Sequence, residues 1–149
     1  MKKHIRIYKQ ILRLRCKPNI TTLEKEMICR CKSIRNIAKK IKIPQHDLPA
    51  TIVGGIYNRS YKIDECKDLI EPIAEPLKIR LLNLGSIGSD NGVNKIGRCA
   101  ENLTANYLML FKKAKKIEDI EFTKAYRPRT ARVIKRCDNC INIFGEHGI

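Results

Sequence analysis

The chain has 149 residues, a length that suits one domain, and 43% of them are apolar, enough to form a core. Its 31 Lys and Arg residues outnumber 15 Asp and Glu, so the formal charge is +16. A chain this basic is attracted to nucleic acid or to anionic membrane surfaces. Only 5% of the residues are aromatic and Trp is absent. This scarcity argues against a sheet that binds single strands by base stacking, because such sheets need exposed rings.

No segment approaches the ~18 uninterrupted apolar residues that a membrane span requires. Residues 1–3 resemble the start of a signal peptide, but basic residues between 6 and 15 interrupt the apolar run that should follow. We therefore expect no signal peptide in this chain. An odd number of cysteines then predicts reduced thiols, some of them available for metal, rather than a disulfide framework. The seven cysteines are Cys16, Cys29, Cys31, Cys66, Cys99, Cys137 and Cys140.

The first 49 residues are predicted to form a basic helical segment. Residues 1–50 hold 14 Lys and Arg against 3 Asp and Glu, whereas residues 51–149 hold 17 against 12. One helix is expected over 4–15, and a second from a capping box of Thr21 and Glu24 to just before Pro44. The basic face of the second helix is either an ordinary solvated surface or a surface that faces nucleic acid. A boundary is expected in the proline-containing connector 44–49.

Residues 50–149 are predicted to form an α/β domain. A hairpin is expected over 50–63, where Gly54 and Gly55 indicate a bulge or the close approach of a ligand. Helices then follow up to residue 84, over 99–116 and from Cys137 to Phe144, with a strand over 120–127. This order favours a mixed sheet that contains a parallel pair and carries helices on its face.

Three of the cysteines have the spacing of a metal site. Cys137 and Cys140 are three residues apart at a predicted helix start, so their sulfurs point the same way, and Cys99 stands at a second helix start. Helix N-termini favour thiolates. Three sulfur ligands leave one position of a tetrahedral zinc open, which is typical of catalytic sites. The alternatives are a closed structural site, with Cys66 or His147 as fourth ligand, and no metal.

Charged residues adjoin these cysteines in the sequence. Glu101 follows Cys99 by two residues, so it projects close to the metal without binding it, and its carboxylate can pass a proton from water to a leaving amine. Three thiolates donate charge to the metal and weaken its activation of water. Arg98 and Arg136, each beside a ligand, are expected to offset this effect through hydrogen bonds to sulfur.

The motif Cys99-Ala100-Glu101, followed by Cys137-Asp138-Asn139-Cys140, resembles the zinc-dependent nucleobase (cytidine) deaminase superfamily. The series is most similar to the YwqJ-type branch, which comprises deaminase domains of bacterial polymorphic toxins. Arg136 departs from this pattern, because the superfamily usually has Pro at that place. The stretches that carry the wider resemblance are Ala50–Gly55, Gly97–Asn102, Tyr126–Thr130, Arg136–Cys140 and Phe144-Gly145.

The resemblance implies a cytidine-deaminase-like fold and hydrolytic removal of the exocyclic amine of a base, cytosine rather than adenine. It implies Zn²⁺ on Cys99, Cys137 and Cys140, with Glu101 as proton shuttle. Asn58 ends the first predicted strand, where related enzymes commonly hold the base or sugar; the alternative is an ordinary turn residue. Arg127 and Arg129 are expected to border the pocket mouth, where they either contact phosphate or belong to a solvated basic loop.

The charge favours DNA or RNA as the substrate over a free nucleoside. A toxin-type domain further implies delivery by secretion, action in the cytoplasm, and a cognate immunity protein as partner. Two other functions fit the sequence. One is a non-catalytic nucleic-acid-binding module that zinc stabilises, and the other is an immunity-related scaffold whose N-terminal helices bind a partner.

Overall fold

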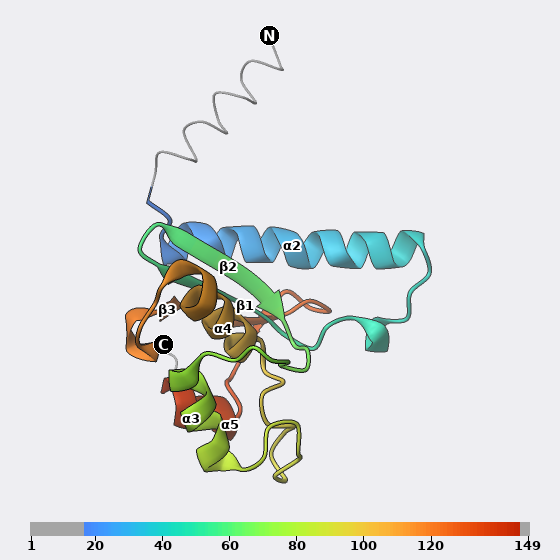
Figure 1. Cartoon of the computed structure of the whole chain (residues 1–149). Helices are drawn as coiled ribbons and strands as arrows, with labels where there is room; N and C mark the ends of the chain where they lie inside the picture. Colours follow the sequence, from blue (N-terminus) through green and yellow to red (C-terminus); the bar gives the residue numbers. More distant parts are fainter. Residues whose placement is uncertain (1–16, 147–149) are drawn as a thin grey trace.

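The computed structural model describes residues 17–146, so the predicted helix over 4–15 and His147 lie outside the described residues. Five strands form one sheet in the order β2-β1-β4-β5, with β3 also paired to β1 (Figure 1). The helices are α2 (Ile20–Lys40), α3 (Glu75–Leu84), α4 (Ala100–Lys112) and α5 (Asp138–Phe144), with short 3-10 turns at Gln45–Asp47 and Ile117–Asp119. The strands are β1 (Ile52–Tyr57), β2 (Ser60–Glu65), β3 (Glu121–Phe122), β4 (Ala125–Arg127) and β5 (Arg132–Ile134).

The predicted α/β class with flanking helices is confirmed, but the mixed sheet with a parallel pair is wrong. Every strand pair in the described part of the chain is antiparallel. The helical crossover does join two strands of the same direction, β2 and β4. They do not pair, because β1 lies between them and runs opposite to both.

The strand predicted over 120–127 is broken in two at Thr123. The backbone N–H of Thr123 donates to the Gly54 carbonyl at 2.9 Å, and its Oγ1 accepts the Gly54 N–H at 2.9 Å. A side-chain oxygen thus takes the place of a backbone carbonyl in the ladder, which separates β3 from β4. Strand β5, which the sequence did not predict, returns beside β4 after a turn over 128–131.

Helix α2 begins at a different cap from the predicted one. Asn19 Oδ1 accepts the backbone N–H of Thr22 at 2.9 Å, so Thr21 lies inside the helix and the predicted capping box is wrong. Glu24 instead accepts the backbone N–H of Lys124 at 3.1 Å. The buried face of α2 joins residues of β1, β2 and β4 in one core cluster: Leu23, Met27, Cys31, Ile52, Ile56, Ile63 and Tyr126.

Gly54 and Gly55 allow helices to approach both faces of β1. A Cβ on Gly54 would lie 2.8 Å from Leu23 Cδ2 of α2, and one on Gly55 would lie 2.5 Å from Thr104 Cγ2 of α4. Neighbouring strand residues point to opposite faces, so α2 and α4 cover opposite faces of the sheet. The glycine pair therefore allows close helix packing. The strand irregularity that was predicted at the glycines lies instead at Thr123, in the segment that pairs with β1.

We expect Gly55→Ala to destabilise the fold by about 1–3 kcal/mol, because its new methyl group collides with the buried Thr104 side chain. Urea unfolding measures the change. The matched control is the same substitution in a Thr104→Ser background, where the colliding methyl group is gone and the cost should fall. Equal costs in the two backgrounds would contradict this account of the packing.

Candidate metal centre

Two helix N-termini bring the three predicted ligands together. Cys99 is the N-cap of α4, Cys137 is the N-cap of α5, and Cys140 lies in the first turn of α5. The three sulfurs lie within 4.8 Å of one another, and those of Cys99 and Cys137, 38 residues apart in the chain, are 3.5 Å apart. Three thiols at this spacing can hold a metal ion.

The donor set fits a tetrahedral metal with one position open. Zinc–sulfur bonds of about 2.3 Å place sulfurs about 3.8 Å apart in a tetrahedron, close to the separations seen here. Among the described residues the group contains no fourth His, Cys, Asp or Glu. Cys66, considered as a fourth ligand, stands apart from the group, and His147 lies outside the described residues.

The closeness of the three thiols shifts their pKa values in opposite directions. The pKa of Cys137 is lowered to about 2, chiefly through the adjacent Cys140 and Cys99 thiols, with help from the backbone N–H groups of Cys140 and Asn139. The pKa of Cys99 and of Cys140 is raised, chiefly through the adjacent Cys137 thiol, and burial adds to the rise. A bound cation would favour the ionisation of all three thiols.

Glu101 lies beside the sulfurs and is shielded from solvent. It is only 3% exposed, and its Oε2 accepts from Cys140 Sγ at 3.6 Å. Burial raises the pKa of its carboxyl group, and the nearby charge of Arg136 opposes that rise. A carboxyl group that is buried beside the ligands and has a raised pKa is suited to exchange protons in the site.

Arg136 contacts the carboxylate and not the sulfurs. Its Nε is 3.4 Å from Glu101 Oε1, and both side chains are about 5% exposed or less. Its guanidinium lies over the rings of Phe122 and Phe144 and donates to the Gly145 carbonyl at 2.8 Å. The prediction that Arg136 bonds to sulfur is corrected accordingly: it neutralises the buried Glu101.

A side chain that does donate to a ligand sulfur is that of Asn94, which the sequence analysis missed. Its Nδ2 donates to Cys99 Sγ at 3.7 Å. The loop that carries Asn94 is fastened to α5, since Asn91 donates to the buried Asn139 side chain at 2.8 Å. The asparagines of the glycine-rich stretch 85–97, and Asn139 within the Cys-x-x-Cys motif, were the available signals.

A cavity of about 350 Å³ adjoins the start of α4 and brings two predicted arginines together. Arg98 and Arg129 line it, together with Cys66. The three ligand sulfurs do not line it. Glu65 and Asp47 also line it, and each lies within ion-pair distance of another side chain, Lys67 and His46 respectively.

The two other predicted substrate residues lie elsewhere. Arg127 is exposed at the end of β4 and is absent from the lining of that cavity. Asn58 lies at the tip of the β1–β2 hairpin, in a groove that Lys112 also lines. Lys112 ends α4, about 18 Å from its first residue at 1.5 Å per residue. The structure therefore separates Asn58 from the sulfurs.

None of the protein-family models, curated proteins or solved structures compared with the chain matches it. The deaminase resemblance accordingly stays a prediction from the motifs. In the part of the chain that the structure describes, no helix has the length and apolar character needed to cross a membrane.

We expect the reduced protein to bind one zinc ion per chain, because three thiols converge. Serine in place of Cys99, Cys137 or Cys140 should abolish stoichiometric binding, whereas serine in place of the exposed Cys29 should leave it intact. Elemental analysis after dialysis measures the metal. Full retention of zinc by all three ligand variants would show that the cluster is not a metal site.

We expect Arg136→Met to lower the free energy of unfolding of the metal-free protein by about 3–5 kcal/mol at pH 7, because it leaves a carboxylate buried without its cation. The loss should be smaller in a Glu101→Gln background, where no buried charge is left unpaired. It should also shrink as the pH falls toward the ordinary Glu pKa of about 4.3, since the folded-state carboxyl group then takes up a proton. Equal losses in both backgrounds, measured by urea unfolding, would rule out the pairing.

Proposed function

We propose that the protein is a zinc-dependent deaminase that removes the exocyclic amine of a nucleobase, cytosine in preference to adenine, within a nucleic acid. The observation that carries the proposal is the placement of Glu101. Its carboxylate lies beside three converging sulfurs, is 3% exposed, and stands 3.6 Å from one of them. An acid beside a three-ligand site is the arrangement that proton transfer to and from a metal-activated water requires.

Zinc bound by Cys99, Cys137 and Cys140 would supply a Lewis acid and activate water for attack. Glu101 takes a proton from the attacking water at a carboxylate oxygen and delivers it to the adjacent ring nitrogen of the base as the new C–O bond forms. It then takes the remaining hydroxyl proton and delivers it to the exocyclic amine, so the C–N bond breaks, ammonia leaves, and the water oxygen becomes the carbonyl oxygen of the base. Arg136 holds the carboxylate in place, and burial keeps bulk water from competing for the proton.

Charge supports a polymeric substrate. The chain carries a formal charge of +16, and phosphate groups are the anions that such a surface attracts most strongly. Arg98 and Arg129, which line the cavity next to the start of α4, are placed to contact a phosphate near the reacting base.

The toxin-type role, with delivery by secretion, action in the cytoplasm and a cognate immunity partner, depends on the motif resemblance alone. The second candidate is the non-catalytic module in which zinc only stabilises the fold. The paired charges of Glu101 and Arg136 favour it, because a buried ion pair can also be purely structural.

We expect the zinc-loaded protein to convert bases in DNA or RNA pools, and Glu101→Gln to lower the rate by about 10²–10⁴-fold because the proton shuttle is lost. Sequencing of the incubated pools measures conversion, and retained zinc shows that the variant site is intact. The exposed Glu121→Gln serves as matched control. Absence of conversion above the Glu101→Gln level in every pool would reject the enzyme and leave the non-catalytic module.

A further inference from the structure

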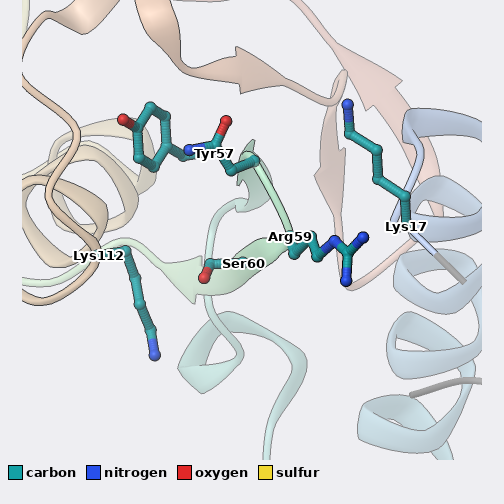
Figure 2. Close-up of a pocket in the computed structure, with 6 residues that line it drawn as sticks. Lys17, Tyr57, Arg59, Ser60 and Lys112 are labelled. Carbon is teal, nitrogen blue, oxygen red and sulfur yellow. The ribbon is translucent and has the colours of Figure 1, made fainter. Parts of the chain in front are cut away.

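The end of the sheet opposite the metal centre carries an open groove of about 570 Å³ (Figure 2). Three cationic residues from separate parts of the fold line it: Lys17 before α2, Arg59 in the β1–β2 turn, and Lys112 at the end of α4. Tyr57, Asn58 and Ser60 supply the rest of the lining, which contains no carboxylate.

The positive charges of the groove are not neutralised by acidic side chains of the described residues. Within the described residues none of the three cations forms an ion pair. Figure 2 shows Lys17 and Arg59 on one side of Ser60 and Lys112 on the other, so the charges flank the groove and do not converge on one point. Cations spread along an open groove suit a polyanion better than a single small anion.

The segment after Lys112 extends this charge. Lys113, Lys115 and Lys116 follow Lys112 and are exposed. Positive charge therefore continues beyond the groove at the end of α4, which suits a charged polymer longer than the groove itself.

An exposed aromatic ring lies next to Lys112 in the sequence of α4. Phe111, next to Lys112, is 67% exposed, although it lies on the same helix as well-packed apolar residues. It contacts Tyr107, whose ring centroid is 5.2 Å from its own, and Lys62 Nζ lies 4.7 Å over the Tyr107 ring. The pair gives Phe111 a firm backing and leaves it accessible, as a ring that stacks on a base must be.

We infer that this groove binds single-stranded nucleic acid, with Lys17, Arg59 and Lys112 on its phosphates and Phe111 stacked on one base. Nucleic acid is favoured over an anionic membrane, because the lining has no aliphatic side chain to insert among lipids. The inference rests on the proposed function only in taking a polynucleotide as the substrate. The groove would hold that strand about 18 Å from the metal centre, at the far end of α4.

The test is the equilibrium binding of a labelled 20-nucleotide oligothymidylate to the full zinc-loaded chain. Fluorescence anisotropy of the label measures the affinity at each salt concentration of a series. We expect Arg59→Glu with Lys112→Glu to weaken binding at least tenfold, and to reduce the slope of log K against log salt by about 1.4, since two phosphate contacts are lost. The matched control, Lys39→Glu with Lys40→Glu in the exposed last turn of α2, has the same change in charge and should weaken binding less than threefold.

Phe111→Ala should weaken binding of the single strand about fivefold or more while changing binding of a duplex of equal length less than twofold. Phe111→Leu, which keeps apolar bulk without the π face, should reproduce this loss if the alanine variant folds poorly.

Equal weakening by the two charge-reversal pairs would overturn the inference, as would an unchanged affinity in the Arg59 and Lys112 pair. Binding of phosphatidylserine vesicles that depends on Arg59 and Lys112, without binding of the oligonucleotide, would assign the groove to a membrane surface instead. The binding assay does not depend on base conversion. A failure of the groove inference can therefore be told apart from a failure of the deaminase proposal.

Discussion

The close approach of α4 to β1 is the constraint on which the rest of the molecule depends. It is possible because Gly55 has no side chain on the face that Thr104 occupies, where a Cβ would come within 2.5 Å of the Thr104 methyl group. Once α4 lies on the sheet, both of its ends are fixed. The N-terminal end presents Cys99 and Glu101, and the C-terminal end presents Lys112 at the tip of the hairpin.

The metal centre is completed by contacts that belong to other parts of the chain. The amide pair of Asn91 and Asn139 holds the loop before α4 against the start of α5, where Cys137 and Cys140 lie. Arg136 lies over two aromatic rings that contact each other and offsets the buried charge of Glu101. Burying a carboxylate is costly without such a cation. The acid and its arginine are therefore best understood as one unit.

The two ends of α4 differ in chemistry, and the difference follows from charge and burial. At its start, a buried acid and three sulfurs form a compact cluster with low solvent access. At its end, exposed cations border an open groove. In the proposed function the first end would act on the base, and the second would hold the polymer to which the base belongs. Helix α4 lies between the two sites and would fix the distance from the metal centre to the groove.

The sequence alone determined the α/β class, the hairpin, the helix starts at Cys99 and Cys137, and the local pairing of Cys137 with Cys140, because these follow from periodicity and from spacing within short segments. Three further features depend on which strands become neighbours and on where long side chains find a partner. These are the all-antiparallel sheet, the break at Thr123, and the turn of Arg136 toward Glu101 instead of sulfur. Only the tertiary structure decided them, since the placement of β1 between β2 and β4 and the packing of Arg136 over Phe122 and Phe144 are set by contacts among residues distant in the chain.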